Sequence, residues 1–264
     1  QTKKKKSAIF RLHEHVDRLF NSAIILGIDI PFSQKEIFAA IQLVVRKNKL
    51  KECYIRPIVF LGHNQMGLNP NGVDVRVAIA AWPWGTYLGD EGLSRGIRVR
   101  ISSFTRHHVN ITMTRAKACG HYVNSILAKT EAVRDGYDEA ILLDSQGYVS
   151  EGSGENIFLL SKGRLKTPAL SCSNLEGITR DSVFDIAKHL KIEVEEGRIT
   201  RDELYIADEV FLTGTAAEIT PVREIDNRII GNGKRGKTTT RIQKMFFEIV
   251  HGNHAKFKKW LSEV

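Results

Sequence analysis

The sequence has few cysteines and prolines and no long apolar run. Of its 264 residues only three are cysteine and six are proline. No apolar stretch reaches the roughly 18–20 residues that a membrane-spanning helix needs, and the start, QTKKKKSAIF, lacks the apolar centre of a signal peptide. The cysteines, Cys53, Cys119 and Cys172, are odd in number and far apart, which fits reduced thiols better than a disulfide framework. We therefore expect a cytoplasmic protein with no membrane partner.

The charge is unbalanced in the positive direction, with a formal net charge of +9. The lysine and arginine clusters at 3–6, 234–237 and 256–259 lie near the termini or in turn-like sequence, and apart from Phe257 they lack the interleaved aromatic residues of many nucleic-acid-binding modules. Solvated surface is the favoured interpretation, so we expect no nucleic-acid partner. A basic nucleic-acid-binding protein remains the alternative from another functional class.

The first third of the chain predicts a small α+β domain. Apolar residues recur at helical spacing from Val16 to Ile24 and stop at Gly27, and Ser33 with Glu36 has the pattern of a capping box at the start of a second helix. The β-branched segments 54–62 and 73–82 read as strands. We assign 1–82 to this domain and the Gly-rich segment 83–96 to a linker.

The remainder, 97–264, predicts a larger domain. The expected elements are a strand at 97–104, a helix at 116–135, hairpins over 139–152 and 156–165, a helix around 183–190, a strand at 209–214 and a C-terminal helix around 242–250. Strands and helices neither alternate strictly nor segregate fully, so the pattern predicts a two-domain α+β protein.

Two segments have the features of anion-binding turns. Gly177, Ile178 and Thr179 stand at the start of the helix around 183–190, where unpaired N–H groups and the helix dipole favour an anion, and Thr179 is a candidate cap. Gly214 and Thr215 follow a predicted strand and offer backbone donors and a hydroxyl in a tight turn. Each segment by itself has an ordinary alternative, a capped helix or a strand-to-turn exit.

Three charged residues stand in unusual surroundings. Lys117 lies among small residues in the predicted helix at 116–135, just before Tyr122. Glu151 and Glu155 lie in YVSEGSGENIF, where the glycines weaken a strand and suggest a bulge or the close approach of a ligand. A solvated lysine and a charged hairpin are the ordinary alternatives, and none of these signals is specific by itself.

Taken in order, the motifs closely resemble those of the branched-chain-amino-acid aminotransferases, class IV enzymes of fold type IV that depend on pyridoxal 5′-phosphate. The resemblance rests on HEHVDRL, YIRP, PWGTYLG, AKACGHYVNS, GYVSEGSGENIF, LEGITRD, ADEVFLTGTAAEITPV and RIQKMFFEI, which span essentially the whole chain. It implies a small α/β domain, a larger domain with a β-barrel-like core, a homodimer or dimer-based hexamer, and no metal. The activity it implies, within branched-chain amino-acid biosynthesis, is transamination between leucine, isoleucine or valine and 2-oxoglutarate.

The resemblance also implies roles for individual residues. Lys117 matches the lysine that forms the imine with the cofactor and moves the substrate proton. Arg115 is a candidate for a neighbouring cation that favours the uncharged form of this amine. Glu151 matches the carboxylate that bonds the pyridine nitrogen, and Tyr122 the phenol beside the cofactor's O3′. The implied phosphate and ring contacts are Arg18, Leu175, Gly177, Ile178, Thr179, Gly214 and Thr215. Glu155 has no matching role and is interpreted as a structural carboxylate.

Substrate choice is implied by a second set of residues. The site must accept both an aliphatic side chain and the carboxylate of glutamate, which requires an apolar wall and a cation. Tyr54, Trp84 and Tyr87 match the wall, Arg56 the cation, and Thr215 with Ala216 the donors to the α-carboxylate, although core packing is the ordinary alternative for Trp84.

Two departures from the family pattern accompany the resemblance. Cys119 and His121 replace residues of the common GGNY motif and are interpreted as tolerated changes. We also expect roughly forty further residues, part of the small domain, to precede this start in relatives, which would leave the pocket of this chain incomplete. A D-amino-acid aminotransferase or an aminodeoxychorismate lyase of the same fold remains the alternative function.

Overall fold

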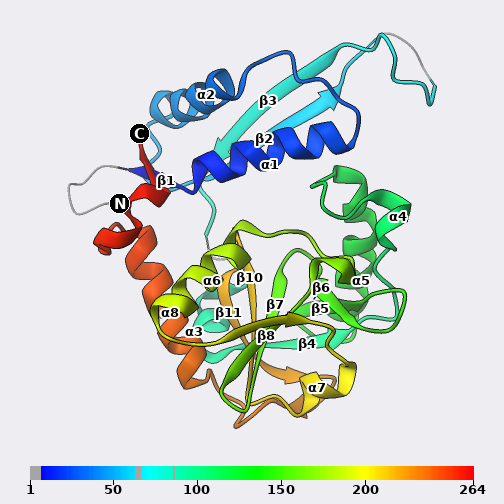
Figure 1. Cartoon of the computed structure of the whole chain (residues 1–264), viewed down its shortest axis with the longest axis vertical. Helices are drawn as coiled ribbons and strands as arrows, with labels where there is room; N and C mark the ends of the chain where they lie inside the picture. Colours follow the sequence, from blue (N-terminus) through cyan, green and yellow to red (C-terminus); the bar gives the residue numbers. More distant parts are fainter. Residues whose placement is uncertain (1–6, 64–66, 86) are drawn as a thin grey trace. The chain divides into compact units, whose positions relative to one another are not determined.

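The computed structural model describes residues 7–63, 67–85 and 87–264 (Figure 1). Its internal contacts divide the chain into two compact units. The N-terminal unit comprises residues 1–85 together with 248–264, and the central unit comprises residues 86–247. The lysine cluster at 3–6 lies outside the described residues.

The N-terminal unit packs two helices against a β-hairpin. Helices α1 (Leu12–Ile25) and α2 (Gln34–Lys47) contribute buried apolar residues such as Val16 and Ile41, and Ile55 and Val77 of the hairpin β2 (Tyr54–Leu61) and β3 (Val75–Trp82) pack against them. The predicted capping box is confirmed, because Ser33 and Glu36 exchange hydrogen bonds at the start of α2. The predicted stop of α1 is also confirmed, since Gly27 follows it with a φ of 69°.

The first and last strands of the N-terminal unit pair with each other. Strand β1 (Ala8–Phe10) runs antiparallel to β13 (Leu261–Glu263), and a 3-10 helix, Ala255–Trp260, precedes β13. Residues 248–264 thus group with the N-terminal unit, whereas the sequence placed them in the large domain. The sequence missed this because a three-residue pairing between the two ends of a chain leaves no periodic signal.

The central unit is built on one mixed sheet. Its elements are α3 (Gly89–Arg95), β4 (Ile97–Ile101), α4 (Val109–Thr112), a 3-10 turn (Cys119–His121), α5 (Tyr122–Arg134), β5 (Glu139–Leu143), β6 (Val149–Gly152), β7 (Asn156–Ser161), β8 (Arg164–Pro168), a 3-10 turn (Leu170–Cys172), α6 (Ile178–His189), β9 (Val194–Gly197), α7 (Arg201–Tyr205), β10 (Glu209–Gly214), β11 (Glu218–Ile225), β12 (Arg228–Ile229) and α8 (Lys237–Val250), whose last residues belong to the N-terminal unit. The strand order is β6-β5-β4-β11-β10-β7-β8-β9, with β12 on β11. Strand β6 also contacts β7, so the sheet curls as expected for a barrel-like core (Figure 1).

The curled sheet buries a continuous apolar core. Val99, Ile141, Leu159 and Leu212 from four strands are all at most 1% exposed. Helix α5 covers β5, and α6 covers β10 (Figure 1). This rigid sheet fixes the ends of β6, β7 and β10 beside one another, which matters for the residues described next.

The predicted hairpins are confirmed, but the helix predicted at 116–135 begins later. Lys162 and Gly163 both have positive φ between β7 and β8, as the two-residue turn requires. By contrast, residues 116–118 are not helical, and α5 starts at Tyr122 after a 3-10 turn. The prediction relied on the helix propensity of the small residues at 116–118, which the structure shows to be non-helical. The expected linker also contains a helix, α3.

Candidate active site

Glu151 is the most constrained of the candidate residues. It lies on β6 and is 5% exposed. Its Oε1 is 2.7 Å from Nη2 of Arg106, and its Oε2 accepts a hydrogen bond of 3.0 Å from the backbone N–H of Leu175. Burial raises the pKa of Glu151, while the Arg106 guanidinium and the N–H of Leu175 oppose that shift. The structure therefore presents a buried carboxylate with a counter-charge already in place.

Arg106 was not identified from the sequence. It is 6% exposed, and its Nη1 also bonds Asn124 Oδ1 at 3.3 Å and Ser125 Oγ at 3.2 Å, both on α5. It follows β4 by five residues in RHHVN, where an arginine beside two histidines resembles any polar loop. Only the fold shows that it meets Glu151.

The segment before α6 is held through the backbone of Leu175. Its N–H bonds Glu151, and its carbonyl accepts a 2.8 Å hydrogen bond from Nδ2 of Asn156, the first residue of β7. Asn156 Oδ1 in turn occupies the space beside Gly177, since a Cβ on Gly177 would overlap that oxygen. We call Glu151, Arg106, Asn156 and Leu175 the Glu151 network. It fixes the residues that lead into α6.

The first predicted anion-binding turn has the expected backbone. Gly177 is the N-cap of α6, and as a glycine it has no side chain to cap the N–H groups of the first turn. Thr179 was considered as a cap, but it lies inside the first turn and is buried, so this detail was wrong. The N–H groups of Ile178 and Thr179 therefore stand at a helix start that favours an anion.

The second predicted turn also forms where expected. Strand β10 ends at Gly214, and Thr215 and Ala216 lie in the turn before β11. Thr213 is paired in register with Asn156 of β7, and its Oγ1 is buried without a hydrogen-bond partner among the described residues. Strand pairing thus brings this turn to the same end of the sheet as the Glu151 network.

Lys117 lies in the segment between α4 and the 3-10 turn. Its side chain is exposed, and Nζ is 5.6 Å from the ring centroid of Tyr122, the first residue of α5. Its charge acts on the buried Glu151. Arg115, proposed from the sequence as a neighbouring cation, is exposed and forms an ion pair of 2.7 Å with Glu176.

The ring of His121 supports the segment that carries the lysine. It hydrogen-bonds the backbone of Thr112 and Ala116, the residue before Lys117, and lies 4.8 Å from the ring of His107. Burial lowers the pKa of both histidines, that of His107 to about 4. His121, interpreted from the sequence as a tolerated change, thus contacts the residues next to Lys117.

The N-terminal unit carries Tyr54, Arg56 and Trp84, three of the six residues expected to contact substrate. Tyr54, Trp82 and Trp84, which we call the aromatic wall, contact one another with ring centroids 4.6 to 5.8 Å apart. The guanidinium of Arg56 lies 5.3 Å from the ring of Tyr54 and 5.5 Å from that of Trp82. Trp82 was not predicted, although its place opposite Tyr54 in the hairpin would have indicated it.

Arg18 belongs to the N-terminal unit as well. It lies on α1, and its Nη2 is 3.4 Å from Nδ1 of His15, one turn earlier. Both residues belong to the motif HEHVDRL, which the structure shows to be helical. The role of Arg18 toward a phosphate stays a prediction.

Tyr87 and Glu155 lie together in the central unit. Burial raises the pKa of both groups, and Glu139 raises each further. Glu139, which is fully buried, is paired with Lys129 at 2.7 Å, and Lys129 Nζ lies 5.5 Å from the Tyr87 ring. Glu155 is therefore a buried carboxyl that favours its neutral form, rather than an edge charge.

Two absences apply to the described part of the chain. Within it, no group of three or more histidine, cysteine, aspartate or glutamate side chains is placed to hold a metal ion. Among the same residues, no helix is both long enough and apolar enough to cross a membrane.

Comparison with known proteins gives consistent matches. The family model for amino-transferase class IV matches residues 2–225. The branched-chain-amino-acid aminotransferase of Pseudomonas aeruginosa is 54% identical over 254 residues, which cover 96% of this chain and 82% of the relative. That of Escherichia coli strain K12 is 47% identical over 261 residues, which cover 98% and 84%.

Solved structures agree with this. The crystal structure of the Escherichia coli branched-chain amino acid aminotransferase matches with a TM-score of 0.96 at 47% identity and covers 98% of this chain and 85% of the other. The branched-chain amino acid aminotransferase of Thermobaculum terrenum, solved in its PLP form, matches with a TM-score of 0.92 at 36% identity and covers 97% and 83%.

Proposed function

The chain belongs to the class IV aminotransferases and is an α+β enzyme of fold type IV, and from that premise we propose that it transfers the amino group between branched-chain L-amino acids and 2-oxoglutarate. The products are branched-chain 2-oxo acids and L-glutamate, and the cofactor is pyridoxal 5′-phosphate. Relatives named for this activity are 47–54% identical over nearly the whole chain. The predicted cytoplasmic location and the linker bounds of 83–96 stay predictions.

The residues of the central unit fit the cofactor. A pyridine nitrogen needs a buried carboxylate to stay protonated, and Glu151 is one with its position fixed from two sides. A phosphate needs N–H and hydroxyl donors, which Gly177 to Thr179 and the turn at Gly214 and Thr215 supply. Asn156 lies so close to Gly177 that no side chain would fit at position 177, which helps to fix the backbone at the start of α6.

The cofactor, when bound, supplies an aldehyde and an electron-withdrawing ring that makes the α-proton of an amino acid removable. Within that chemistry we assign Lys117 Nζ to the covalent attachment of the cofactor and to the removal of the α-proton. The hydroxyl of Tyr122, beside Lys117, would donate to the cofactor's phenolic oxygen, and Arg18 keeps the phosphate role that the resemblance implies for it. The backbone N–H groups of Thr215 and Ala216 hold the substrate's α-carboxylate.

The observation that carries the choice of substrate is the aromatic wall with Arg56 against it. A leucine side chain loses little on packing beside aromatic rings, whereas the side-chain carboxylate of glutamate needs a cation when it leaves water. Arg56 is exposed and rests on the faces of Tyr54 and Trp82, so its guanidinium can turn toward the carboxylate of glutamate and stay on the rings when an aliphatic substrate binds. Trp84 adds a third ring to this wall, and Tyr87 keeps the substrate role that the resemblance implies for it.

The test is a substrate panel with added pyridoxal 5′-phosphate. Leucine, isoleucine and valine with 2-oxoglutarate should be turned over far faster than D-alanine or aminodeoxychorismate. Faster turnover of D-alanine or release of pyruvate from aminodeoxychorismate would move the chain to another activity of the same fold. A protein that shows no absorbance of bound cofactor after free pyridoxal 5′-phosphate is removed would contradict the proposal altogether.

We also propose that the protein is a homodimer or a dimer-based hexamer. Helix α5 has two apolar faces: Ala128 and Ala132 are buried on the sheet, while Val123 and Ile126 on the other face are 64% and 61% exposed. Ile111 on α4 is 70% exposed. Apolar patches of this kind mark protein interfaces, and sedimentation velocity will report whether a second copy covers it.

A further inference from the structure

The pair formed by Arg106 and Glu151 has a structural setting that the proposed function does not explain. Both side chains are almost fully buried, 7% and 6% exposed, and Nη2 of Arg106 is 2.7 Å from Oε1 of Glu151. The other carboxylate oxygen is taken by the N–H of Leu175. Both oxygens of Glu151 therefore have a fixed partner, and the carboxylate plane cannot rotate.

Arg106 is itself held by the element that follows Lys117. Its Nη1 bonds Asn124 and Ser125 in the first turn of α5, and its backbone N–H donates to the carbonyl of Leu143 on β5 at 2.8 Å. The guanidinium thus spans from α5 to β6. A lysine in its place has a single point of charge and could not make the same set of bonds.

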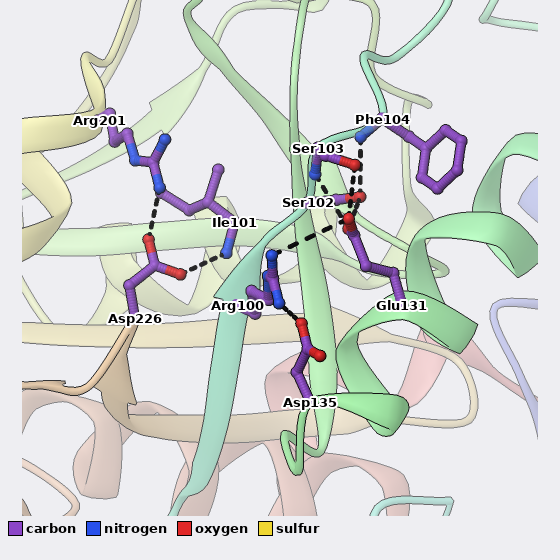
Figure 2. Close-up of polar contacts among 9 residues, drawn as sticks. All are labelled: Arg100, Ile101, Ser102, Ser103, Phe104, Glu131, Asp135, Arg201 and Asp226. Carbon is purple, nitrogen blue, oxygen red and sulfur yellow. Dashed lines mark hydrogen bonds and ion pairs between the residues drawn. The ribbon is translucent and has the colours of Figure 1, made fainter.

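The loop that carries Arg106 is fixed to the same helix. Figure 2 shows Glu131 of α5 accepting hydrogen bonds from the Ser102 hydroxyl at 2.6 Å and the Ser103 N–H at 2.9 Å. Arg100 also pairs with Glu131, at 4.0 Å, and with Asp135 at the end of α5 (Figure 2). These contacts lock the residues between β4 and Arg106 against α5.

Lys117 is the other cation whose charge acts on Glu151. The proposed function assigns its amine to the covalent attachment of the cofactor, so that its charge is not a permanent counter-charge. The guanidinium of Arg106, by contrast, stays charged at every working pH. Glu151 needs such a partner because a buried carboxylate without one takes up a proton.

We propose that Arg106 is a positioning residue of the active site, which holds the carboxylate of Glu151 ionised and in one orientation and ties it to α5, the helix that begins beside Lys117. This inference rests on the proposed function. In this proposal Arg106 does not itself touch the cofactor and acts on it only through the carboxylate of Glu151. The residue therefore acts on the affinity for pyridoxal 5′-phosphate only as long as Glu151 is present.

The first experiment is a double-mutant cycle with Arg106→Met, Glu151→Gln and the double variant, read out as the affinity for pyridoxal 5′-phosphate. Arg106→Met should weaken binding about 10- to 100-fold in the parent but less than about 3-fold in Glu151→Gln, because the arginine acts through the carboxylate. Arg201→Met is the matched control: Arg201 pairs with Asp226 at 2.8 Å in the same unit (Figure 2), and its loss should leave the affinity unchanged. Equal losses in both backgrounds would overturn the proposal.

The second experiment needs no cofactor and is made in a Lys117→Ala background, because the free amine of Lys117 would otherwise act as a second counter-charge to Glu151. Infrared difference spectra at neutral pH between Arg106→Met and Arg106→Met/Glu151→Gln should show the band of a protonated carboxyl that is absent from the corresponding pair with Arg106 intact. Absence of that band would show that Glu151 stays ionised without Arg106 and would overturn the proposal. If the parent fails to bind the cofactor, the proposed function fails, while the infrared result still decides the role of Arg106.

Arg106→Lys guards against a variant that does not fold. It keeps one positive charge beside Glu151 but cannot make the remaining bonds to α5. We expect no protonated band and a loss of affinity of about 3- to 10-fold. A lysine variant with the full loss of Arg106→Met would show that charge is not what Arg106 supplies.

Discussion

The Glu151 network in the central unit and the aromatic wall in the N-terminal unit differ in how their charged side chains are held. The charges of Arg106 and Glu151 are buried, and each has several fixed partners. Arg56 is exposed and rests on aromatic faces, and Trp84 is 41% exposed. A buried charge tolerates only one arrangement, because every lost partner leaves an unpaired group. An exposed cation on an aromatic face costs little to move.

The difference teaches where chemistry and choice are placed in this enzyme. In the proposed function, the steps common to all substrates require a fixed geometry, for which the central unit offers sheet ends and a helix start. Acceptance of two unlike side chains would require an adaptable cation, and Arg56 on the hairpin of the N-terminal unit is the residue proposed for that role. Substitutions in the first region should therefore damage every substrate alike, and substitutions in the second should separate them.

The largest effect is expected from Lys117→Ala. Turnover should fall about 1,000-fold or more with every amino acid, because both the covalent attachment and the proton transfer are lost. The measurements are the rate with leucine and with glutamate and the absorbance of the bound cofactor. Arg115→Ala, two residues away and exposed, should stay near the parent rate. Activity retained in Lys117→Ala would assign the chemistry to another lysine.

The next effect separates the two substrate classes. Arg56→Leu should reduce kcat/KM for glutamate relative to leucine by about 30- to 150-fold, since one charge-assisted hydrogen bond at a partly desolvated carboxylate is worth about 2–3 kcal/mol. The control is Arg76→Leu, an exposed arginine on the neighbouring strand that pairs with Asp74. An equal loss for both substrates would make Arg56 part of the hairpin's framework.

A smaller effect tests the tight packing beside α6. In Gly177→Ala the new Cβ would displace the Asn156 side chain and break its bond to Leu175. Overpacking of this kind costs about 1–3 kcal/mol, so thermal stability and cofactor affinity should both fall. Gly154→Ala, where a Cβ meets open space, should leave both near the parent values. A fully stable Gly177→Ala would mean that the segment before α6 adapts after all.

The smallest effect concerns pH. Burial, Arg106 and His121 lower the pKa of His107 to about 4, so the folded state prefers the neutral ring. The stability that this contributes is present above about pH 6.5, the value of an unfolded histidine, and is lost as the pH falls toward 4.

Denaturant titrations of His107→Gln test this directly. Between pH 6.5 and 4, the free energy of unfolding of the variant should fall by about 1 kcal/mol less than that of the parent. This amount is discounted for the partial exposure of the ring. His63→Gln, an exposed histidine of the N-terminal unit, should follow the parent. If the free energies of unfolding of all three proteins change in parallel with pH, His107 does not contribute to the pH dependence of stability.

Much of the fold could be predicted because local rules decide it. The capping box at Ser33, the turn at Lys162 and Gly163 and the alternating strands each carry their own signal. The start of α5 could not be predicted, since 116–118 have ordinary helical composition, and the hydrogen bond from the His121 ring to the backbone of Ala116 leaves no periodic signal. The pairing of β1 with β13 is likewise a property of the assembled unit.

The candidate site divides in the same way. Lys117, Glu151 and Gly177 were predicted because motifs mark them. Arg106 and Asn156 were missed, since an arginine in a loop and an asparagine at the start of a strand gain a purpose only from the partner they meet. Family resemblance therefore finds the groups that touch the reacting molecules more readily than the groups that hold them.

The grip on Leu175 has a consequence for how this position can vary. Glu151 and Asn156 bond only its N–H and its carbonyl, and no side-chain atom of Leu175 takes part in either bond. Every genetically encoded residue except proline carries both groups, since proline alone lacks the N–H. Position 175 is thus open to redesign: its side chain can be exchanged to reshape the surroundings of Glu151, while the backbone bond that holds the carboxylate is kept.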